Sequence, residues 1–295
     1  MISTDTNFIV SFPGLGINDV TINRVAFTLF GVEVYWYGLL IASAVILGLL
    51  LAYRSAPKYG IKSDHVLDTM IGIVPAMIIF ARIYYVIFEW DEFRDRPLSV
   101  FNLRTGGLGF YGGVIGGIIA ILIVTGIRKI SLSRMMDLLC VYVPLGQGIG
   151  RWGNFFNQEA FGYNTDLPWG MKSDGTYDYL LRTGIGDPNL PVHPTFLYEF
   201  LANMLIFAAL LFIRRKSVRP YVTTAWYLLL YGIVRFFVES LRTDSLYILN
   251  TGLRASMVLS AVMVLVSAGF IIFMQTRPVV PGKAGRVEID GPPKE

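Results

Sequence analysis

The stretch YVTTAWYLLLYGIVRFFVESL, residues 221–241, decides the fold. Most of its residues are apolar, and a helix needs about 20 such residues to cross a lipid bilayer. Its two charged residues, Arg235 and Glu239, lie in its last third. The stretch therefore predicts a transmembrane helix that carries charge into the membrane, where ionised groups are costly.

The composition of the whole chain agrees with this prediction. Of 295 residues, 54% are hydrophobic and 16% are charged, and the mean hydropathy is +0.56. Soluble domains contain about 25% charged residues. These values exclude an intrinsically disordered chain and argue strongly against a soluble globular protein.

Six further stretches have the length and apolarity of membrane spans. They cover residues 34–53, 66–88, 107–127, 132–150, 194–213 and 254–274. The stretch 132–150 is the weakest of them, because it contains Asp137, Pro144 and several glycines. The predicted fold is an all-α integral membrane protein with seven transmembrane helices between residues 34 and 274.

The distribution of Lys and Arg predicts the orientation of these helices. With the N-terminus outside, the inner segments hold fourteen Lys and Arg and the longer outer segments hold nine. Positive charge gathers on the inner side of bacterial membrane proteins. We therefore expect the N-terminus outside and the C-terminus inside, with a small extracytoplasmic portion.

Three segments lie outside the predicted helices. Residues 1–33 lack the pattern of a signal peptide, and alternating apolar residues from Val20 to Leu29 indicate short strands or an interfacial segment. Residues 159–193 form an outer loop. Residues 275–295 are rich in Pro, Gly and charge, which predicts a disordered cytoplasmic tail.

Cysteine and histidine are too scarce for several kinds of site. The chain has one Cys, Cys140, and two His, so an internal disulfide framework and a cysteine-rich metal site are excluded. We expect no metal and no cofactor. The net charge of +4 reflects membrane topology rather than nucleic-acid binding.

Charged residues share one face of the helix predicted at 221–241. Tyr231, Arg235, Glu239 and Arg242 are spaced by four, four and three residues, which aligns them on a helix. One interpretation is an internal ion pair between Arg235 and Glu239 that joins helices. The other is an anion site, because a guanidinium binds phosphate with two parallel hydrogen bonds.

A second polar cluster ends the helix predicted at 132–150. It contains Arg151, Asn154, Asn157 and Glu159. A snorkelling Arg with helix caps would account for one Arg, but not for this number of polar groups beside an apolar region.

Further candidates lie at the ends of other spans. They are Tyr37, Arg82, His193 and the glycine run 106–113, with Tyr111, Gly112 and Gly113. Tight helix packing is the alternative role for the glycines. In the predicted topology every one of these polar clusters lies near the outer face, which favours one shared site.

The polar clusters resemble the prolipoprotein diacylglyceryl transferases of bacterial inner membranes. The stretch from Gly150 to Glu159, GRWGNFFNQE, with Gly162 after it, is similar to the signature of that family. Flanking matches follow in the expected order: Tyr35–Gly38, Gly106–Gly107, Tyr111–Gly113, His193–Thr195, Leu197–Glu199, and Tyr231–Gly232 with Arg235, Glu239 and Arg242. The resemblance covers residues 34–274.

The resemblance implies a reaction and its partners. A diacylglyceryl group passes from phosphatidylglycerol to the lipobox Cys thiol of a prolipoprotein, and glycerol phosphate leaves. The partners are phosphatidylglycerol, the prolipoprotein signal peptide and membrane lipids, with no nucleic acid. The enzyme is expected to cross the bacterial inner membrane several times, with its active site near the outer leaflet.

Roles follow for the residues that match. Arg151 and Arg235 are expected to hold the phosphate, and Glu239 to orient Arg235. The expected substrate-binding residues are Arg82, Gly112, Gly113, Asn154, Asn157, Glu159, His193, Tyr231 and Arg242.

Tyr111 departs from the family pattern, because many members have His before the paired Gly. A phenol has a reference pKa near 10 and an imidazole near 6.5. Tyr111, with Tyr37 nearby, is the candidate for assisting deprotonation of the thiol. Tyr111 could act as a hydrogen-bond donor, or as a base if nearby arginines lower its pKa.

Three other functions compete with this one. A transporter with an outward anion site would also bury arginines, but such folds often have repeated halves and the chain shows no repeat. Another enzyme that uses phosphatidylglycerol would share the Arg pair without the 150–159 signature. A purely structural membrane protein leaves the gathering of polar clusters at one face unexplained.

Overall fold

The computed structural model describes residues 6–103, 106–248 and 251–277. The chain divides into two compact units, which we describe separately. The first unit comprises Met1–Gly48 and Cys140–Val280, and the second comprises Leu49–Leu139 and Pro281–Glu295. Most of the tail predicted at 275–295 lies outside the described residues.

Six helices among the described residues are long and apolar enough to cross a membrane. They are α1 (Trp36–Ser55), α2 (Ser63–Phe88), α3 (Phe110–Ile127), α7 (Thr195–Lys216), α8 (Val222–Leu241) and α9 (Ala255–Gln275). Large apolar side chains such as Ile71, Leu205 and Leu265 are exposed on them. A continuous apolar exterior of this kind is typical of a surface in contact with lipid.

The segment predicted as a single span at 132–150 differs from the prediction. It forms two helices, α4 (Leu132–Leu139) and α5 (Val143–Asn157), with a turn between them. Pro144 lies in the first turn of α5. A proline is tolerated there because the first N–H groups of a helix have no partner within it, but in the interior of a longer helix it would break the hydrogen bonding. The helix α5 then runs seven residues beyond the predicted end and brings Arg151, Asn154 and Asn157 into helical conformation.

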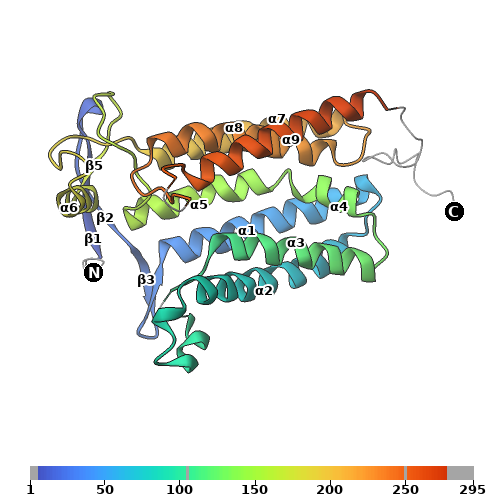
Figure 1. Cartoon of the computed structure of the whole chain (residues 1–295), viewed down its shortest axis with the longest axis horizontal. Helices are drawn as coiled ribbons and strands as arrows, with labels where there is room; N and C mark the ends of the chain where they lie inside the picture. The colour runs from blue at the N-terminus through green and yellow to red at the C-terminus, as the bar shows by residue number, and fades with distance from the viewer. Residues whose placement is uncertain (1–5, 104–105, 249–250, 278–295) are drawn as a thin grey trace. The chain divides into compact units, whose positions relative to one another are not determined.

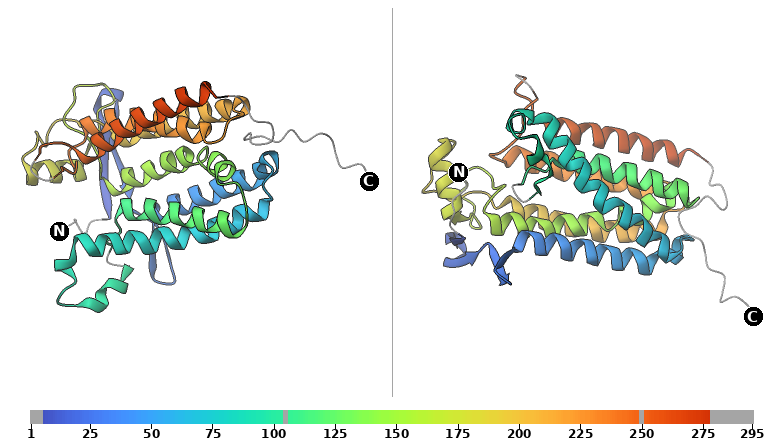
Figure 2. Two further views of the ribbon diagram at one scale, coloured as in Figure 1. Left: turned by 45° about the vertical axis from the view of Figure 1, so that its right-hand side comes forward. Right: turned by 90° about the horizontal axis from the view of Figure 1, so that it is seen from below.

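The helices of the first unit pack through small residues. In Figures 1 and 2, α7, α8 and α9 run side by side, and α5 packs against α7. A Cβ atom on Gly148 of α5 would meet the side chains of Asn203 and Phe200 of α7 at 3.4 and 3.5 Å. Such positions let helix backbones approach closely in membranes.

A small lobe of strands and loops extends this unit beyond the helices. We call residues 7–23 and 159–193 the strand lobe. Strands β1 (Asn7–Phe12), β2 (Ile17–Asn23) and β5 (Lys172–Ser173) form a sheet of order β2-β1-β5. All neighbours are antiparallel, and Val10 lies opposite Ser173. The helix α6 (Asp174–Thr183) follows β5 directly, with a capping box between Ser173 and Thr176.

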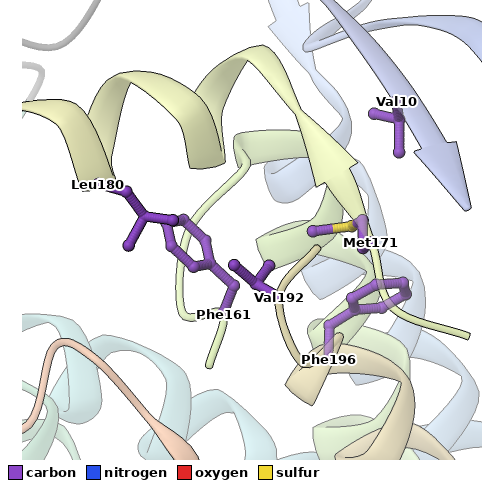
Figure 3. Close-up of a cluster of buried hydrophobic side chains, with 6 residues drawn as sticks. All are labelled: Val10, Phe161, Met171, Leu180, Val192 and Phe196. Carbon is purple, nitrogen blue, oxygen red and sulfur yellow. The ribbon is translucent and has the colours of Figure 1, made fainter. Parts of the chain in front are cut away.

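The strand lobe has its own apolar core. The buried side chains come from β1, the outer loop, α6 and the start of α7 (Figure 3). They are Val10, Phe161, Met171, Leu180, Val192 and Phe196. Because Phe196 belongs to α7, this core fixes the lobe to the first turn of that helix.

A hairpin leads from the strand lobe into α1. It consists of β3 (Val25–Leu29) and β4 (Val32–Tyr35), which pair in antiparallel orientation. The strands predicted from the alternation at residues 20–29 are therefore present, in β2 and β3. The fold is mostly helical, with two small sheets before the first helix and in the outer loop.

The second unit centres on the contact of α2 with α3 (Figure 1). Gly112 and Gly116 of α3 lie so close to α2 that an added Cβ would meet Ala81 or Phe80 within 3 Å. The helix α3 begins at Phe110 rather than at 107, because Gly106 and Gly107 have φ angles of +81° and +79°. Short 3-10 turns cover Trp90–Glu92 and Pro97–Phe101.

Candidate active site

Four charged side chains of alternating sign lie in a row in the first unit. Arg151 Nη2 is 2.5 Å from Glu199 Oε2, and the other oxygen of Glu199 is 3.1 Å from Arg235 Nη1. Arg235 Nη2 is 2.6 Å from Glu239 Oε2. We call these four residues the charge chain. It connects α5, α7 and α8 through side chains that would be unfavourable in lipid on their own.

Burial differs between the acids and the bases of the charge chain. The carboxylate side chains of Glu199 and Glu239 are each 2% exposed, whereas Arg151 and Arg235 are 19% and 15% exposed. The acids therefore form the inner support, and the guanidinium groups are the parts open to a ligand.

The charge chain is neutral but retains hydrogen-bond capacity. Arg151 uses Nη2 for Glu199 and donates from Nη1 to Asn154 Oδ1 at 3.1 Å. Arg235 Nη1 donates to Glu199 Oε1, and its Nη2 forms an ion pair with Glu239. A guanidinium has five N–H groups, so these contacts leave several donors on each Arg for an anion.

The end of α5 extends this network with amides. Asn154 donates from Nδ2 to Glu159 Oε1 at 2.8 Å, and Asn157 donates to the same oxygen at 3.2 Å. The backbone reverses here, because Gln158 adopts a left-handed conformation with φ of 54°. The turn brings Glu159 back over the last turn of α5, and its carboxylate orients both amides.

Two aromatic residues at the start of α1 pack against α5. A Cβ on Gly153 would lie 3.2 Å from Tyr37 Cγ, so the Tyr37 ring rests on that glycine. Trp36 stacks on Phe156 with ring centroids 5.0 Å apart. Tyr37 of α1 thus packs on a glycine that follows Arg151 by two residues in α5. On α8, Tyr231 lies one turn before Arg235 and stacks on Tyr227 at 5.8 Å.

Arg242 and Asp244 form a bidentate pair just after α8. Arg242 Nε and Nη2 donate to Asp244 Oδ1 and Oδ2 at 2.8 and 2.7 Å. Burial alone would raise the pKa of Asp244, but the hydrogen bonds and charge of Arg242 lower it overall. Both groups are therefore ionised at neutral pH, and the Arg242 fork is already occupied.

His193 lies in a neutral hydrogen-bond cluster before α7. Its Nδ1 is 3.1 Å from the Tyr198 hydroxyl, which also accepts a hydrogen bond from Trp169 Nε1 at 2.9 Å. Burial lowers the pKa of His193. The imidazole is therefore neutral at pH 7 and joins the outer loop to α7.

Arg82, in the second unit, has a different environment from the arginines of the charge chain. Its five N–H groups meet five backbone carbonyls, those of Ser99, Val100, Asn102, Gly106 and Gly107, at 2.7–3.2 Å. Its guanidinium carbon is 4.9 Å from the centre of the Phe93 ring. Every donor of this side chain is used by backbone carbonyls at residues 99–102 and 106–107.

The other predicted residues of the second unit surround the start of α3. Gly112 and Gly113 are buried in the contact with α2. Tyr111 is half-buried beside Tyr84, with ring centroids 6.2 Å apart. Among the described residues, no hydrogen bond to the Tyr111 hydroxyl is found.

Two residues of this site were missing from the predicted set. Glu199 joins both arginines of the charge chain, and it could have been found, because it is a carboxylate inside an apolar stretch. Arg254 precedes α9 and donates to the backbone carbonyl of Glu239 and, at 3.2 Å, to the Tyr163 hydroxyl. Only tertiary structure reveals the position of Arg254.

Comparisons with known proteins agree with one another. The model of the prolipoprotein diacylglyceryl transferase family matches residues 24–273. Three similar proteins are named phosphatidylglycerol–prolipoprotein diacylglyceryl transferase. The one from Clostridioides difficile strain 630 is 46% identical over 76% of this chain and 85% of its own. The one from Finegoldia magna is 41% identical over 85% and 94%, and that of Enterococcus faecalis strain V583 is 38% identical over 87% and 92%.

Proposed function

The chain belongs to the prolipoprotein diacylglyceryl transferase family, and from this premise we propose the reaction and the residues that carry it out. The enzyme transfers the diacylglyceryl group of phosphatidylglycerol to the lipobox Cys thiol of a prolipoprotein. The thiolate sulfur attacks the glyceryl carbon that carries the phosphate ester. A C–S bond forms, the C–O bond breaks, and glycerol phosphate leaves with the electron pair while the thiol proton is released.

The observation that carries this proposal is the position of Arg151 and Arg235 on the two oxygens of Glu199. The phosphate gains negative charge as it leaves, and fixed donors at that point lower the barrier. Two guanidinium groups held by one carboxylate meet this need, because their orientation is set before the substrate arrives. Glu239 acts through Arg235 as a positioning residue.

We assign the remaining residues of the first unit around this centre. Asn154, Asn157 and Glu159 bind the glycerol head group through the amide network at the end of α5. Tyr231 lies on the same helix as Arg235, Arg242 follows the end of that helix, and both border the lipid. His193 fixes the loop 159–193 beside them. The hydrogen bonds described above support these roles, because they hold polar groups at one end of α5 and α8.

Deprotonation of the thiol is assigned to Tyr111, and Tyr37 is the second candidate for this role. A thiol has a pKa near 8.5 and attacks only as a thiolate. In Tyr111→Phe we expect a slower transfer with an altered pH profile. An unchanged rate and pH profile would exclude an acid–base role for this phenol.

In the second unit we assign Gly112 and Gly113 to the close approach of α3 to α2 beside the lipid path. For Arg82 the geometry favours a role different from the predicted phosphate contact. Since its five donors are occupied by backbone carbonyls, we assign it to the shape of the segment 99–107.

We propose seven membrane crossings, with the N-terminus outside and the C-terminus inside. The pairing of β1 with β5 supports this number. Paired strands lie on the same side of the membrane, so the chain between them crosses an even number of times. Three long helices, α1–α3, lie between them, and α4 with α5 supply the fourth crossing, since they rise about 12 and 22 Å.

This topology places the charge chain at the outer leaflet of the bacterial inner membrane. The charge chain lies at the end of α8 that is joined to the strand lobe, where Tyr163 donates to the Leu241 carbonyl at 2.9 Å. The strand lobe contains the N-terminal strands and therefore faces outward in the proposed orientation. An anionic lipid of the outer leaflet has its phosphate at this level.

Purified protein in detergent with phosphatidylglycerol and a lipobox peptide tests the reaction. We expect the peptide mass to increase by one diacylglyceryl group at its Cys, with release of glycerol phosphate. A peptide with Ser in place of that Cys is the matched control and should stay unmodified. No mass increase, with a native lipobox sequence and a folded protein, would refute the proposal. A flux assay in liposomes tests the competing transporter function.

A further inference from the structure

A groove lies between α7, α8 and α9 at their ends remote from the charge chain. It has a volume of about 240 Å³, and its walls are mostly apolar. Phe212, Trp226 and Ile271 contribute to these walls, and Lys216, Ser217 and Arg219 border them. The groove therefore combines apolar walls with two cationic side chains at its border.

Two polar atoms at this groove are buried without a partner. Ser217 Oγ and Arg219 Nε are inaccessible to solvent and have no hydrogen bond within the described part of the chain. A buried donor without an acceptor is unfavourable. If the two side chains turn toward the groove, an oxygen-rich anion bound there can accept a hydrogen bond from each of them.

Arg219 is held in place by a neighbouring helix end. Its Nη2 donates to the carbonyls of Gln275 and Arg277 at 3.4 and 3.2 Å. These contacts cap the end of α9 and provide hydrogen-bond acceptors for one nitrogen of the guanidinium. They provide no acceptor for Arg219 Nε or for the Ser217 hydroxyl.

The helix α8 adds favourable polarity at the same place. It begins at Val222, which lines the groove. The N-terminal end of a helix carries partial positive charge and unpaired N–H groups. The groove thus offers an anion two basic side chains, a hydroxyl and a helix start.

The groove is separate from the proposed reaction centre. Val222 and Arg235 are both on α8, thirteen residues apart, which corresponds to about 20 Å along the helix. A phosphate bound at one place cannot contact the other.

We propose that this groove binds an acidic glycerophospholipid, distinct from the lipid consumed in the reaction. Its phosphate contacts Lys216, Ser217 and Arg219, and one acyl chain lies along Phe212, Trp226 and Ile271. A zwitterionic lipid is disfavoured, because its ammonium group is repelled by the same cations. The lipid stabilises the junction of α7, α8 and α9.

Trp226 allows a direct test, because its indole lines the groove. Full-length protein is placed in nanodiscs with a small fraction of phosphatidylserine or phosphatidylcholine carrying brominated acyl chains, which quench nearby tryptophans. Phosphatidylserine is acidic and is not the proposed donor. The difference in quenching between the unaltered protein and Trp226→Phe gives the signal of Trp226 alone, without that of the other tryptophans.

The expected result is a preference for the acidic lipid. A basic side chain near an acidic head group contributes about fivefold, so the Trp226 signal should be quenched at least about fivefold more strongly by phosphatidylserine. The ratio should fall toward one in the double variant Lys216→Ala with Arg219→Ala. Arg215→Ala is the matched control, because Arg215 is exposed on the same turn but does not line the groove.

Equal quenching by the two lipids in the unaltered protein would overturn the proposal. An equal loss of preference in Arg215→Ala would also overturn it, because that result indicates general attraction of lipid by surface charge. Lys216→Ala alone keeps the test valid if the double variant does not fold, since Lys216 is exposed. Transfer to the lipobox peptide should continue in all these variants, so this test and that of the reaction fail independently.

Discussion

The two units bury arginine in opposite ways. In the first unit, Arg151 and Arg235 share the carboxylate of Glu199. In the second unit, Arg82 donates to five backbone carbonyls, and none of the described residues gives it a carboxylate partner. A buried guanidinium can therefore be stabilised either by opposite charge or by complete use of its hydrogen-bond donors.

The difference determines what each arginine can do. A carboxylate that bridges two arginines through one oxygen each can share them with an incoming phosphate, because the remaining guanidinium N–H groups can donate to phosphate oxygens. Five carbonyls belonging to one loop leave no donor for a ligand. We therefore expect mutations of the charge chain to reduce activity and mutations of Arg82 to reduce stability.

The largest expected effect is that of removing an arginine of the charge chain. Arg151→Ala or Arg235→Ala should lower the turnover of lipobox peptide by about a hundred- to a thousandfold, because loss of one donor to a developing anion has this magnitude. Thermal unfolding in detergent should show that the protein remains folded. Arg215→Ala is the matched control. Transfer within a factor of a few of the original rate would remove the assigned roles.

Exchanging the bridging carboxylate should have the next largest effect. Glu199→Gln keeps the shape but weakens two charge-assisted contacts, so we expect a loss of about ten- to a hundredfold in turnover. Glu239→Gln should cost less, because Glu239 contacts one arginine of the charge chain. A greater loss in Glu239→Gln than in Glu199→Gln would contradict the central position of Glu199.

Arg82→Lys separates charge from hydrogen bonding in the second unit. An ammonium has three donors, so at least two of the five carbonyls lose their partner. We expect cleavage by protease within 99–107 to accelerate by about tenfold, since an unpaired buried group costs about 1–3 kcal/mol. The turnover of undigested protein should change little.

Arg94→Lys is the control for that experiment, because Arg94 lies in the same connection between α2 and α3 and its side chain is 66% exposed. If Arg82 instead holds the lipid phosphate, Arg82→Lys should raise KM for phosphatidylglycerol without loosening the loop. That pattern would restore the role predicted for Arg82 from the sequence.

The smallest expected effect concerns a side chain that stays neutral. Burial lowers the pKa of His193 below its ordinary value of 6.5, so the unfolded chain takes up a proton first as the pH falls. The contribution of His193 to the free energy of unfolding is therefore at its maximum above about pH 6.5 and decreases as the pH falls below that value. The melting temperature should fall by about one to two degrees between about pH 7.5 and pH 5.5, and less in His193→Gln. An equal decrease in both proteins would exclude His193 as the source.

The sequence predicts the long helices well, because a membrane span leaves a continuous apolar stretch. Six of the seven stretches contain helices of sufficient length. The exception is the fourth stretch, which forms the two shorter helices α4 and α5. Hydropathy also places its end at residue 150, although α5 continues to Asn157. Polar residues lower the hydropathy there without interrupting the helix, since nothing in 151–157 breaks it.

The site is predictable only where its contacts are local. The ion pair of Arg235 with Glu239 follows from their spacing of four residues and is present. The bridge from Arg151 to Arg235 depends on Glu199 of another helix, so no spacing reveals it. The same holds for Arg82, whose carbonyl partners follow it by 17 to 25 residues in a loop without a recognisable pattern.

The pairing of Val10 with Ser173 also means that β1 must wait for its second partner strand during synthesis. Ribosomes add about 5–20 residues per second, so roughly 8–30 s pass between the appearance of the two partners. During this interval the edge of β1 that pairs with β5 has no neighbour, and the helices α1 to α5 are made before one arrives. An unpaired strand edge attracts other strands. The nascent chain is therefore most exposed to mispairing with other chains until Ser173 has been made.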